Sequence, residues 1–226
     1  RWLDDKHPGM RDLLGRKHWV RDPSYIAPQA WRTHLAEHQY PTHYVAEQTS
    51  HWLREHHRQH PGQPFAVVCS FPDPHHPWTP PGRYWDMYKP QDMPVPQTLG
   101  VTDDMAPHVR WLMDERDAGQ AKLDGPRLFA ATAREVQEIT ALTYGMITNI
   151  DDRIGMVMEH LRTLGLDRDT VVIFTSDHGD LMGDHGMRVT NLVRDPAFVS
   201  YLTSGQYEMP LEFRPMARPN WWRCCA

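Results

Sequence analysis

The stretch that decides the fold is Ile173-Phe174-Thr175-Ser176-Asp177-His178-Gly179-Asp180-Leu181-Met182, preceded by Val171 and Val172. A run of apolar, largely β-branched residues ends here in a carboxylate and an imidazole. Such a run is typical of a strand that is buried on both faces of a parallel sheet. Ligands of open α/β sheets bind outside the carboxyl ends of the strands. We therefore expect Asp177 and His178 to lie at this edge as two ligands of a metal site.

A second turn with the same residue types follows at Gly183-Asp184-His185-Gly186 and is expected at the same edge. The apolar positions of residues 136–164 recur at steps of three, four or seven and predict a long helix. Arg134, Glu138, Arg153, Glu159 and Arg162 should lie mostly on its other faces. Gly165 is placed to cap the end of this helix. The helix therefore leads by a short turn into the strand at 171–175.

An upstream segment has the same order of helix, turn and apolar run. Residues 42–57 have helical spacing, Pro61-Gly62 ends the helix, and residues 65–70 form an apolar run that predicts a buried strand. This strand leads into Phe71-Pro72-Asp73-Pro74-His75-His76-Pro77-Trp78. Two helix–turn–strand units predict an α/β fold with a mostly parallel sheet flanked by helices.

Composition and charge limit the classes of protein to which the chain can belong. The chain has 226 residues, 40% hydrophobic and 23% charged, as in an ordinary globular protein. Its formal net charge of -5 gives no basic surface for nucleic acid. No apolar run approaches the roughly 20 residues that span a bilayer, so we expect no membrane partner. Residues 82–127 should form an extended excursion with a short helix at 104–116.

Two segments in this order resemble the type I sulfatases. The segment Ser70–Pro81 is similar to their proline-histidine loop, and the segment Tyr144–Asp180 is similar to their helix and second metal-binding strand. Phosphonate monoester hydrolases are close relatives within the same alkaline phosphatase superfamily. The resemblance implies an alkaline-phosphatase-like fold and hydrolysis of sulfate, phosphonate or phosphate esters, with a small molecule or a carbohydrate as the ester.

The resemblance also implies roles for individual residues. Asp177 and His178 would bind one divalent cation, calcium or manganese, and His75 would be the catalytic histidine that contacts the transferred group or the leaving oxygen. His76 and His185 are candidates for contacts to the substrate or to the side chains around the cation. A cation and a protonated imidazole would stabilise negative charge on the ester oxygens, and an imidazole can donate a proton to a departing alkoxide.

One part of the family pattern has no match here. Family members use a formylglycine nucleophile made from a Cys or Ser in a short motif, and no stretch of this chain fits that motif. We expect residues 1–187 to be an incomplete catalytic domain, with the resemblance strongest over 40–187, and the modification to belong to a missing segment. Residues 188–226 form an atypical tail, expected to be disordered or read in a shifted frame. The chain alone should therefore show negligible turnover. The sequence leaves localisation open, cytoplasmic or exported, and also the oligomeric state.

Other interpretations remain open. The chain could be a non-catalytic remnant, or part of a two-metal phosphatase of the same superfamily, which would bind two cations where a sulfatase binds one. Asp151 and Asp152 could suggest a paired-carboxylate site. Because neighbouring helical side chains point about 100° apart, ion pairing on the helix surface is the preferred interpretation.

Overall fold

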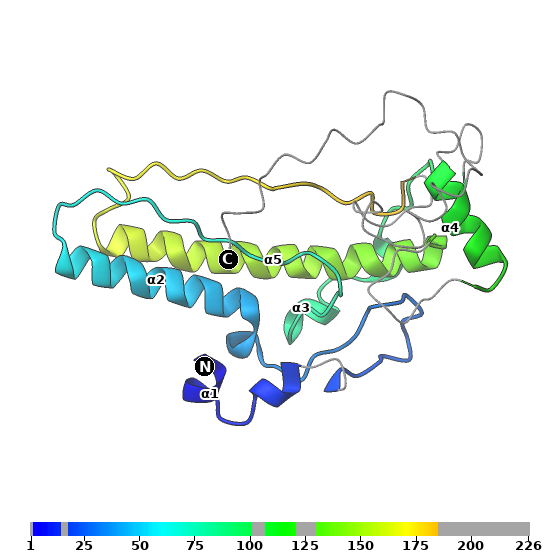
Figure 1. The fold of residues 1–226 in the computed structure, drawn as a ribbon, viewed down its shortest axis with the longest axis horizontal. Helices are drawn as coiled ribbons and strands as arrows, with labels where there is room; N and C mark the ends of the chain where they lie inside the picture. Colours follow the sequence, from blue (N-terminus) through cyan, green and yellow to red (C-terminus); the bar gives the residue numbers. More distant parts are fainter. Residues whose placement is uncertain (1, 15–17, 101–106, 121–129, 185–226) are drawn as a thin grey trace, which may run out of the picture.

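The computed structural model describes residues 2–14, 18–100, 107–120 and 130–184, and two long helices dominate it (Figure 1). The predicted contact residue His185 and the predicted tail 188–226 lie outside the described residues. The helices are α1 (Trp2–Lys6), η1 (Arg11–Leu14), η3 (Glu37–Gln39), α2 (Pro41–Gln59), α3 (Arg83–Asp86), η4 (Pro90–Asp92), α4 (Pro107–Asp117) and α5 (Ala133–Thr163). None of the described helices is both long and apolar enough to cross a membrane.

Helix α5 has well-defined ends. At its start, Thr132 accepts a hydrogen bond from the backbone N–H of Glu135, whose carboxylate in turn accepts from the backbone N–H of Thr132. This reciprocal capping box satisfies two donors that the first turn leaves free. At its end, Gly165 has a φ of 69°, and the N–H of Leu166 donates to the carbonyl of Leu161. This geometry is a Schellman motif, so the predicted glycine cap is confirmed.

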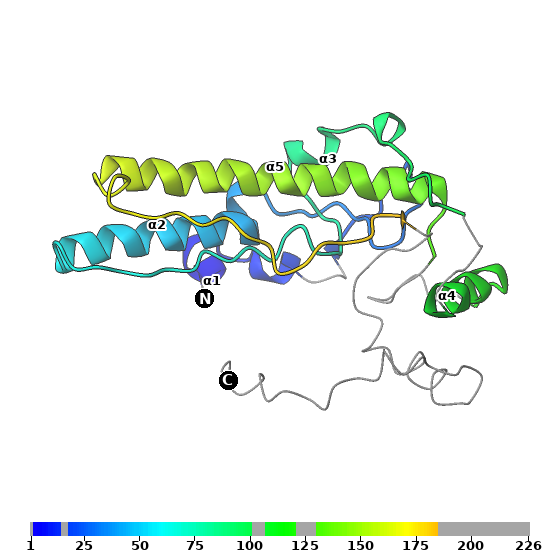
Figure 2. The same ribbon diagram turned by 90° about the horizontal axis from the view of Figure 1, so that it is seen from above.

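Helices α2 and α5 pack against each other and run in the same direction (Figures 1 and 2). After each helix the chain turns and returns along the helix pair as an extended segment, cyan after α2 and yellow after α5. The two extended segments therefore run in the same direction, as the sequence predicts for two successive helix–strand units. Both predicted helices, 42–57 and 136–164, are confirmed within a few residues of their ends.

The predicted parallel sheet is not confirmed. Neither 65–70 nor 171–175 is a strand in the structure, and the β-pairing found in the described part of the chain is limited to isolated bridges, such as Val20–Arg32 and Ala30–Trp78. The expected burial at 171–175 is also wrong, since Val171, Ile173 and Phe174 are 86%, 81% and 83% exposed. An apolar run becomes a buried strand only when neighbouring strands pair with its backbone and both faces are covered. The described residues supply neither at 171–175.

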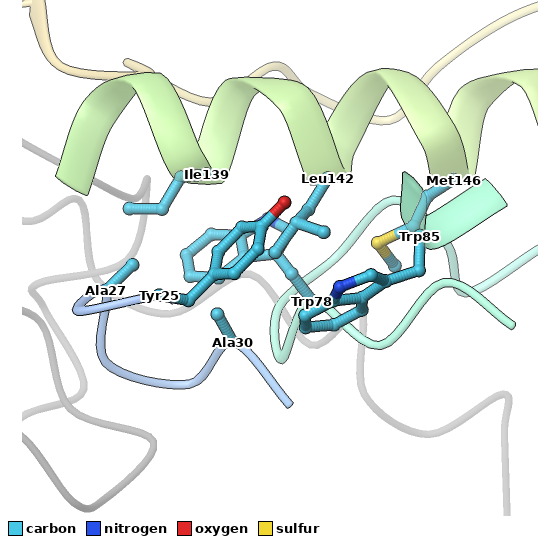
Figure 3. Close-up of a cluster of buried hydrophobic side chains, with 8 residues drawn as sticks. All are labelled: Tyr25, Ala27, Ala30, Trp78, Trp85, Ile139, Leu142 and Met146. Carbon is cyan, nitrogen blue, oxygen red and sulfur yellow. The ribbon is translucent and has the colours of Figure 1, made fainter. Parts of the chain in front are cut away.

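The core lies between the first turns of α5 and the segments that precede α2 and contain α3 (Figure 3). It is built of aromatic and aliphatic side chains, namely Tyr25, Ala27, Ala30, Trp78, Trp85, Ile139, Leu142 and Met146. Trp78 brings the end of the proline-histidine loop into this core, where it is almost completely buried. The loop therefore has one end fixed by packing.

Glu138 departs from the predicted polar faces of α5, because it is fully buried. Its carboxylate accepts hydrogen bonds from the backbone N–H groups of Ile26 and Ala27, at 2.8 and 2.7 Å. Arg134 donates to its other oxygen at 2.7 Å. A buried carboxylate is stable when it is paired and hydrogen-bonded in this way. Glu138 therefore anchors the segment around residue 26 to α5.

Candidate functional site

Asp177 and His178 direct a carboxylate oxygen and a ring nitrogen toward each other. Oδ2 of Asp177 lies 3.6 Å from Nε2 of His178, while Oδ1 accepts a hydrogen bond from the backbone N–H of His178 at 3.0 Å. Nδ1 of His178 lies 3.1 Å from the carbonyl oxygen of Gly179. Because a carbonyl only accepts, Nδ1 carries a proton and the lone pair of the neutral ring is on Nε2. Metal-binding histidines commonly have this arrangement, with the second nitrogen donating to a carbonyl.

The separation of the two atoms suits a shared cation. A carboxylate oxygen and a neutral imidazole nitrogen are both common ligands of divalent cations, so the two residues would hold such an ion together. The Asp177 side chain is 87% exposed, which leaves space for water to complete the coordination. No group of three or more His, Cys, Asp or Glu side chains within the described ranges is arranged to hold a metal. The chemistry of the pair, one carboxylate oxygen and one imidazole nitrogen, therefore fits a cation that keeps most of its other ligands from elsewhere.

The turn after this pair is fixed to the body of the protein. Met182 packs against the core, and Gly183 is buried with a φ of 102°. A Cβ atom at Gly183 would come within 2.6 Å of a methyl group of Val136 on α5. Thr98 donates a hydrogen bond to Asp184 at 2.8 Å. The segment that bears Asp177 and His178 is therefore held at its downstream end, although the pair itself is exposed.

His75 and His76 are also brought together. Their rings stack with centroids 4.1 Å apart, and Nδ1 of His75 lies 2.6 Å from the carbonyl oxygen of His76. The carbonyl again requires a proton on Nδ1, so Nε2 of His75 can accept a proton or, when the ring is charged, donate one. His75 is exposed and His76 is partly buried. His75 thus has the geometry expected of a histidine that reaches a ligand.

Asp73 was given no role by the sequence, yet its carboxylate is the most perturbed one near the predicted site. Burial raises the pKa of Asp73 to about 6, while hydrogen bonds from Thr42 and Tyr40 act in the opposite direction. The only sequence signal is the position of this acid between two prolines, two residues before His75. Its partners lie 31 and 33 residues away at the start of α2, so spacing alone could not find them.

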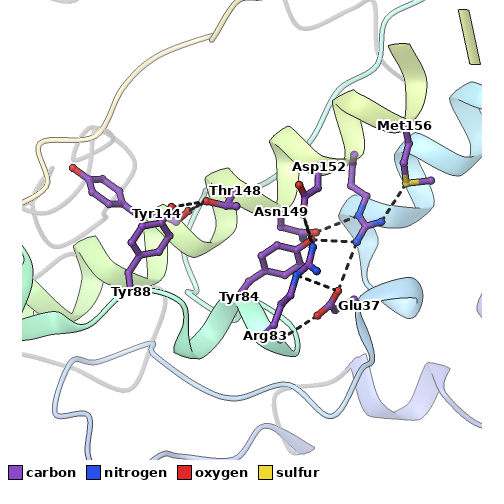
Figure 4. Close-up of polar contacts among 10 residues, drawn as sticks. Glu37, Arg83, Tyr84, Tyr88, Tyr144, Thr148, Asn149, Asp152 and Met156 are labelled. Atoms are coloured by element: carbon purple, nitrogen blue, oxygen red, sulfur yellow. Dashed lines mark hydrogen bonds and ion pairs between the residues drawn. The ribbon is translucent and has the colours of Figure 1, made fainter. Parts of the chain in front are cut away.

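Asp152 has structural partners, as the ion-pairing interpretation predicts (Figure 4). Its Oδ2 accepts from Arg83 and from the Tyr84 hydroxyl, each at 2.6 Å. These bonds tie α3 to α5, and those from Tyr84 and Arg83 lower the pKa of Asp152. The partner is Arg83 of α3 and not the neighbouring Arg153, which donates instead to Asn149 and to the Tyr84 hydroxyl. Asp152 therefore links two helices in this structure.

The fold is similar to that of a solved hydrolase structure. The crystal structure of a phosphonate monoester hydrolase from Agrobacterium radiobacter superposes on 83% of this chain with a TM-score of 0.61. This chain covers 37% of that protein at 24% sequence identity, a level at which the likeness is one of fold.

The family follows from the sequence comparisons. The family model for sulfatases matches residues 4–211, so the chain belongs to the sulfatase family. It is 33% identical over 168 residues to an arylsulfatase of Clostridium perfringens, covering 72% of this chain and 32% of that protein. It is 36% identical over 129 residues to a multifunctional alkaline phosphatase superfamily protein of Trinickia caryophylli, covering 55% of this chain and 25% of that protein. The resemblance seen in the sequence is thereby confirmed.

The chain spans between a quarter and a third of the length of these two curated relatives. The match of the family model continues to residue 211, past the predicted end of the catalytic part at 187. The division at 187 stays a prediction, because residues 185–226 lie outside the described ranges.

Proposed function

We propose that this chain forms the cation-binding part of a hydrolase that acts on sulfate or phosphonate esters. The observation that carries the proposal is the geometry of Asp177 and His178, whose Oδ2 and Nε2 atoms lie 3.6 Å apart in a chain of the sulfatase family. The names of the relatives support the ester class, since they include an arylsulfatase and a phosphonate monoester hydrolase. The substrate is thus a small molecule or a carbohydrate that carries such an ester.

Each residue has a distinct role in this proposal. Asp177 and His178 hold one divalent cation, calcium or manganese, which when bound stabilises negative charge on the ester oxygens. His75 uses Nε2 to contact the transferred group or to donate a proton to the leaving oxygen, and its Nδ1–H bond to the His76 carbonyl orients the ring. His76 and His185 are candidates for further contacts to the ester or to the residues around the cation. The formylglycine nucleophile of the family would come from a segment outside this sequence.

We further propose that residues 65–70 and 171–175 become parallel strands when neighbouring strands pair with them. Their common direction along the helix pair and their exposed β-branched side chains support this proposal (Figures 1 and 2). Pairing would cover the apolar side chains and place Asp177 at the carboxyl end of a strand.

The cation site is tested with manganese, because a paramagnetic ion reveals weak binding through the broadening of nearby NMR signals. We expect binding in about the millimolar range, as for calcium sites with few protein ligands. The signals of residues 177 and 178 should broaden most strongly. The changes Asp177→Ala and His178→Ala should remove the effect, while the control Asp167→Ala, on an exposed turn, should leave it unchanged. Equal broadening in the unaltered chain and in the double variant contradicts the proposal. Two ions bound per chain would instead favour a two-metal phosphatase.

A further inference from the structure

The proline-histidine loop is held at both ends by one tyrosine. The Tyr40 hydroxyl, at the start of α2, lies 3.4 Å from Oδ1 of Asp73 and 3.1 Å from Oγ1 of Thr79. Thr42, in the first turn of α2, donates to Oδ2 of Asp73 at 2.6 Å. Tyr40, Thr42 and Thr79 are all buried. The two residues that flank His75 in the loop, Asp73 and Thr79, are therefore both bound to the same hydroxyl group.

The direction of these hydrogen bonds follows from the groups involved. A phenol has one hydrogen, and an ionised carboxylate only accepts. Tyr40 therefore donates to Asp73 and accepts from Thr79, and Thr42 also donates to Asp73. The backbone reinforces the far end of the loop, since the N–H of Trp78 donates to the carbonyl of Gln29 at 2.9 Å. Between these anchors the exposed His75 stacks on His76.

The carboxylate of Asp73 has no ion-pair partner within the described part of the chain. A partly buried acid that is held by hydroxyl groups alone is costly to maintain, because hydroxyl bonds replace its lost hydration only in part. A structural anchor at this place could be apolar. The free-energy cost of desolvating the Asp73 carboxylate therefore indicates that the loop needs the directional hydrogen bonds of this carboxylate, which an apolar side chain would not provide.

We propose that Asp73 and Tyr40 are positioning residues that fix the backbone of the proline-histidine loop over residues 72–78. In this arrangement Nδ1 of His75 stays bonded to the His76 carbonyl, and Nε2 of His75 faces the ester. This inference rests on the proposed function, which gives His75 its role. Neither residue touches the ester in this arrangement, and both act through the loop backbone. A purely structural role would affect the stability of the fold without affecting the His75 ring.

The test measures the tautomer of His75 in the full chain. Histidine labelled with ¹⁵N reports which ring nitrogen carries the proton, and the measurement uses neither a cation nor an ester. The variants are Tyr40→Phe, which removes the bonds of the tyrosine hydroxyl to Asp73 and Thr79, and Thr42→Val and Asp73→Asn, which each remove one hydrogen bond at Asp73. All three remove little volume. Two controls remove similar groups away from the loop. Tyr84→Phe removes the hydroxyl that bonds Asp152, and Thr163→Val removes a hydroxyl near the end of α5 that bonds the Glu159 carbonyl.

In the three loop variants, the ratio of the Nδ1-protonated tautomer to the other should fall by roughly fivefold, the effect of losing about one hydrogen bond. Both controls should keep the ratio of the unaltered chain. Circular dichroism shows which variants fold, and if Tyr40→Phe unfolds, Thr42→Val and Asp73→Asn decide the outcome. An unchanged ratio in the folded loop variants overturns the positioning role, whatever the manganese experiment gives. If the unaltered chain shows no manganese broadening at residues 177 and 178, in contrast, that result contradicts the proposed function alone.

Discussion

Gly145 of α5 lies directly against the backbone carbonyl of Tyr84 in α3. A Cβ atom at this position would overlap the carbonyl oxygen, and that oxygen belongs to main chain that cannot rotate away. The close approach brings the Tyr84 hydroxyl to Asp152 and lets α3 pack on α5. Gly145 is therefore required by packing, although it lies in the middle of a helix, where glycine is ordinarily unfavourable.

The change Gly145→Ala should destabilise the protein by about 1–3 kcal/mol, because the overlap outweighs the better helix propensity of alanine. Gly155 provides the matched control. It lies in the same helix with open space around it, so Gly155→Ala should stabilise the protein by about 0.5–1 kcal/mol. Urea unfolding followed by circular dichroism measures both changes. Equal stabilisation by the two substitutions would mean that α3 does not pack on α5 as described.

Glu138 should be among the most sensitive positions of the chain. The change Glu138→Ala removes the acceptor of the Ile26 and Ala27 N–H groups and leaves Arg134 without its carboxylate. Leaving the buried Ala27 N–H without an acceptor should cost about 1–3 kcal/mol, while Arg134, which is 46% exposed, can be hydrated in place of its lost partner. The control is Glu159→Ala, which breaks an exposed pair with Arg162 and should cost about 0–1 kcal/mol. Amide hydrogen exchange gives a local readout, since the protection of the Ala27 N–H should be lost in the first variant and kept in the second.

The helices could be predicted from the sequence because the residues that determine each helix lie within or next to that helix. The apolar spacing of 136–164 and the glycine at 165 lie within the segment that they define, and both predictions are confirmed. The contact between Asp177 and His178 is likewise a property of neighbouring residues. The catalytic and metal-binding roles of His75, Asp177 and His178 stay predictions, as does the role of His185.

The other features depend on partners far away in the sequence. The carboxylate of Glu138 bonds to residues 111 and 112 positions away, so its place on a helical wheel could not show that it is buried. The apolar residues of 171–175 predict a strand, but pairing requires a second backbone, which the described residues do not place beside them. The anchor of the proline-histidine loop joins Asp73 to Tyr40 and Thr42, and no motif connects those positions.

The stability of the protein should depend on pH through Asp73. Its pKa is raised from 3.8 to about 6, chiefly by burial, so the folded chain holds this proton more tightly than the unfolded chain does. The free energy of unfolding should therefore fall as pH rises from about 4 to about 6, by on the order of 2–3 kcal/mol, and then level off. The groups that face the carboxylate are the hydroxyls of Tyr40 and Thr42, which do not titrate in this range.

The contribution of Asp73 is isolated by subtracting the free energy of unfolding of Asp73→Asn from that of the unaltered chain at each pH. Both proteins are unfolded with urea at a series of pH values. Asp22, whose pKa is lowered to about 2 by hydrogen bonding from Ser24, affects stability mainly below pH 4 and equally in both proteins. This difference in the free energy of unfolding should fall between pH 4 and pH 6. A difference that does not change with pH would show that the Asp73 carboxylate is hydrated in the folded chain.

Gly183 connects the fold to the proposed cation site. The change Gly183→Ala adds a Cβ atom that meets Val136 and forces an alanine to adopt a φ of 102°. The turn must then move away from α5, and Asp177 and His178 lie on the same segment a few residues upstream. Manganese binding, followed by signal broadening at these two residues, should weaken about fivefold, which corresponds to about 1 kcal/mol.

Gly62→Ala is the control for backbone strain. Gly62 also has a positive φ, 77°, but nothing lies near its Cβ position, and it belongs to the turn after α2. Both substitutions should lower the unfolding temperature, because alanine disfavours positive φ. Only Gly183→Ala should also weaken manganese binding, since only that turn presents the carboxylate and the imidazole. If both variants bind manganese like the unaltered chain, the contact between Gly183 and Val136 does not set the position of Asp177 and His178.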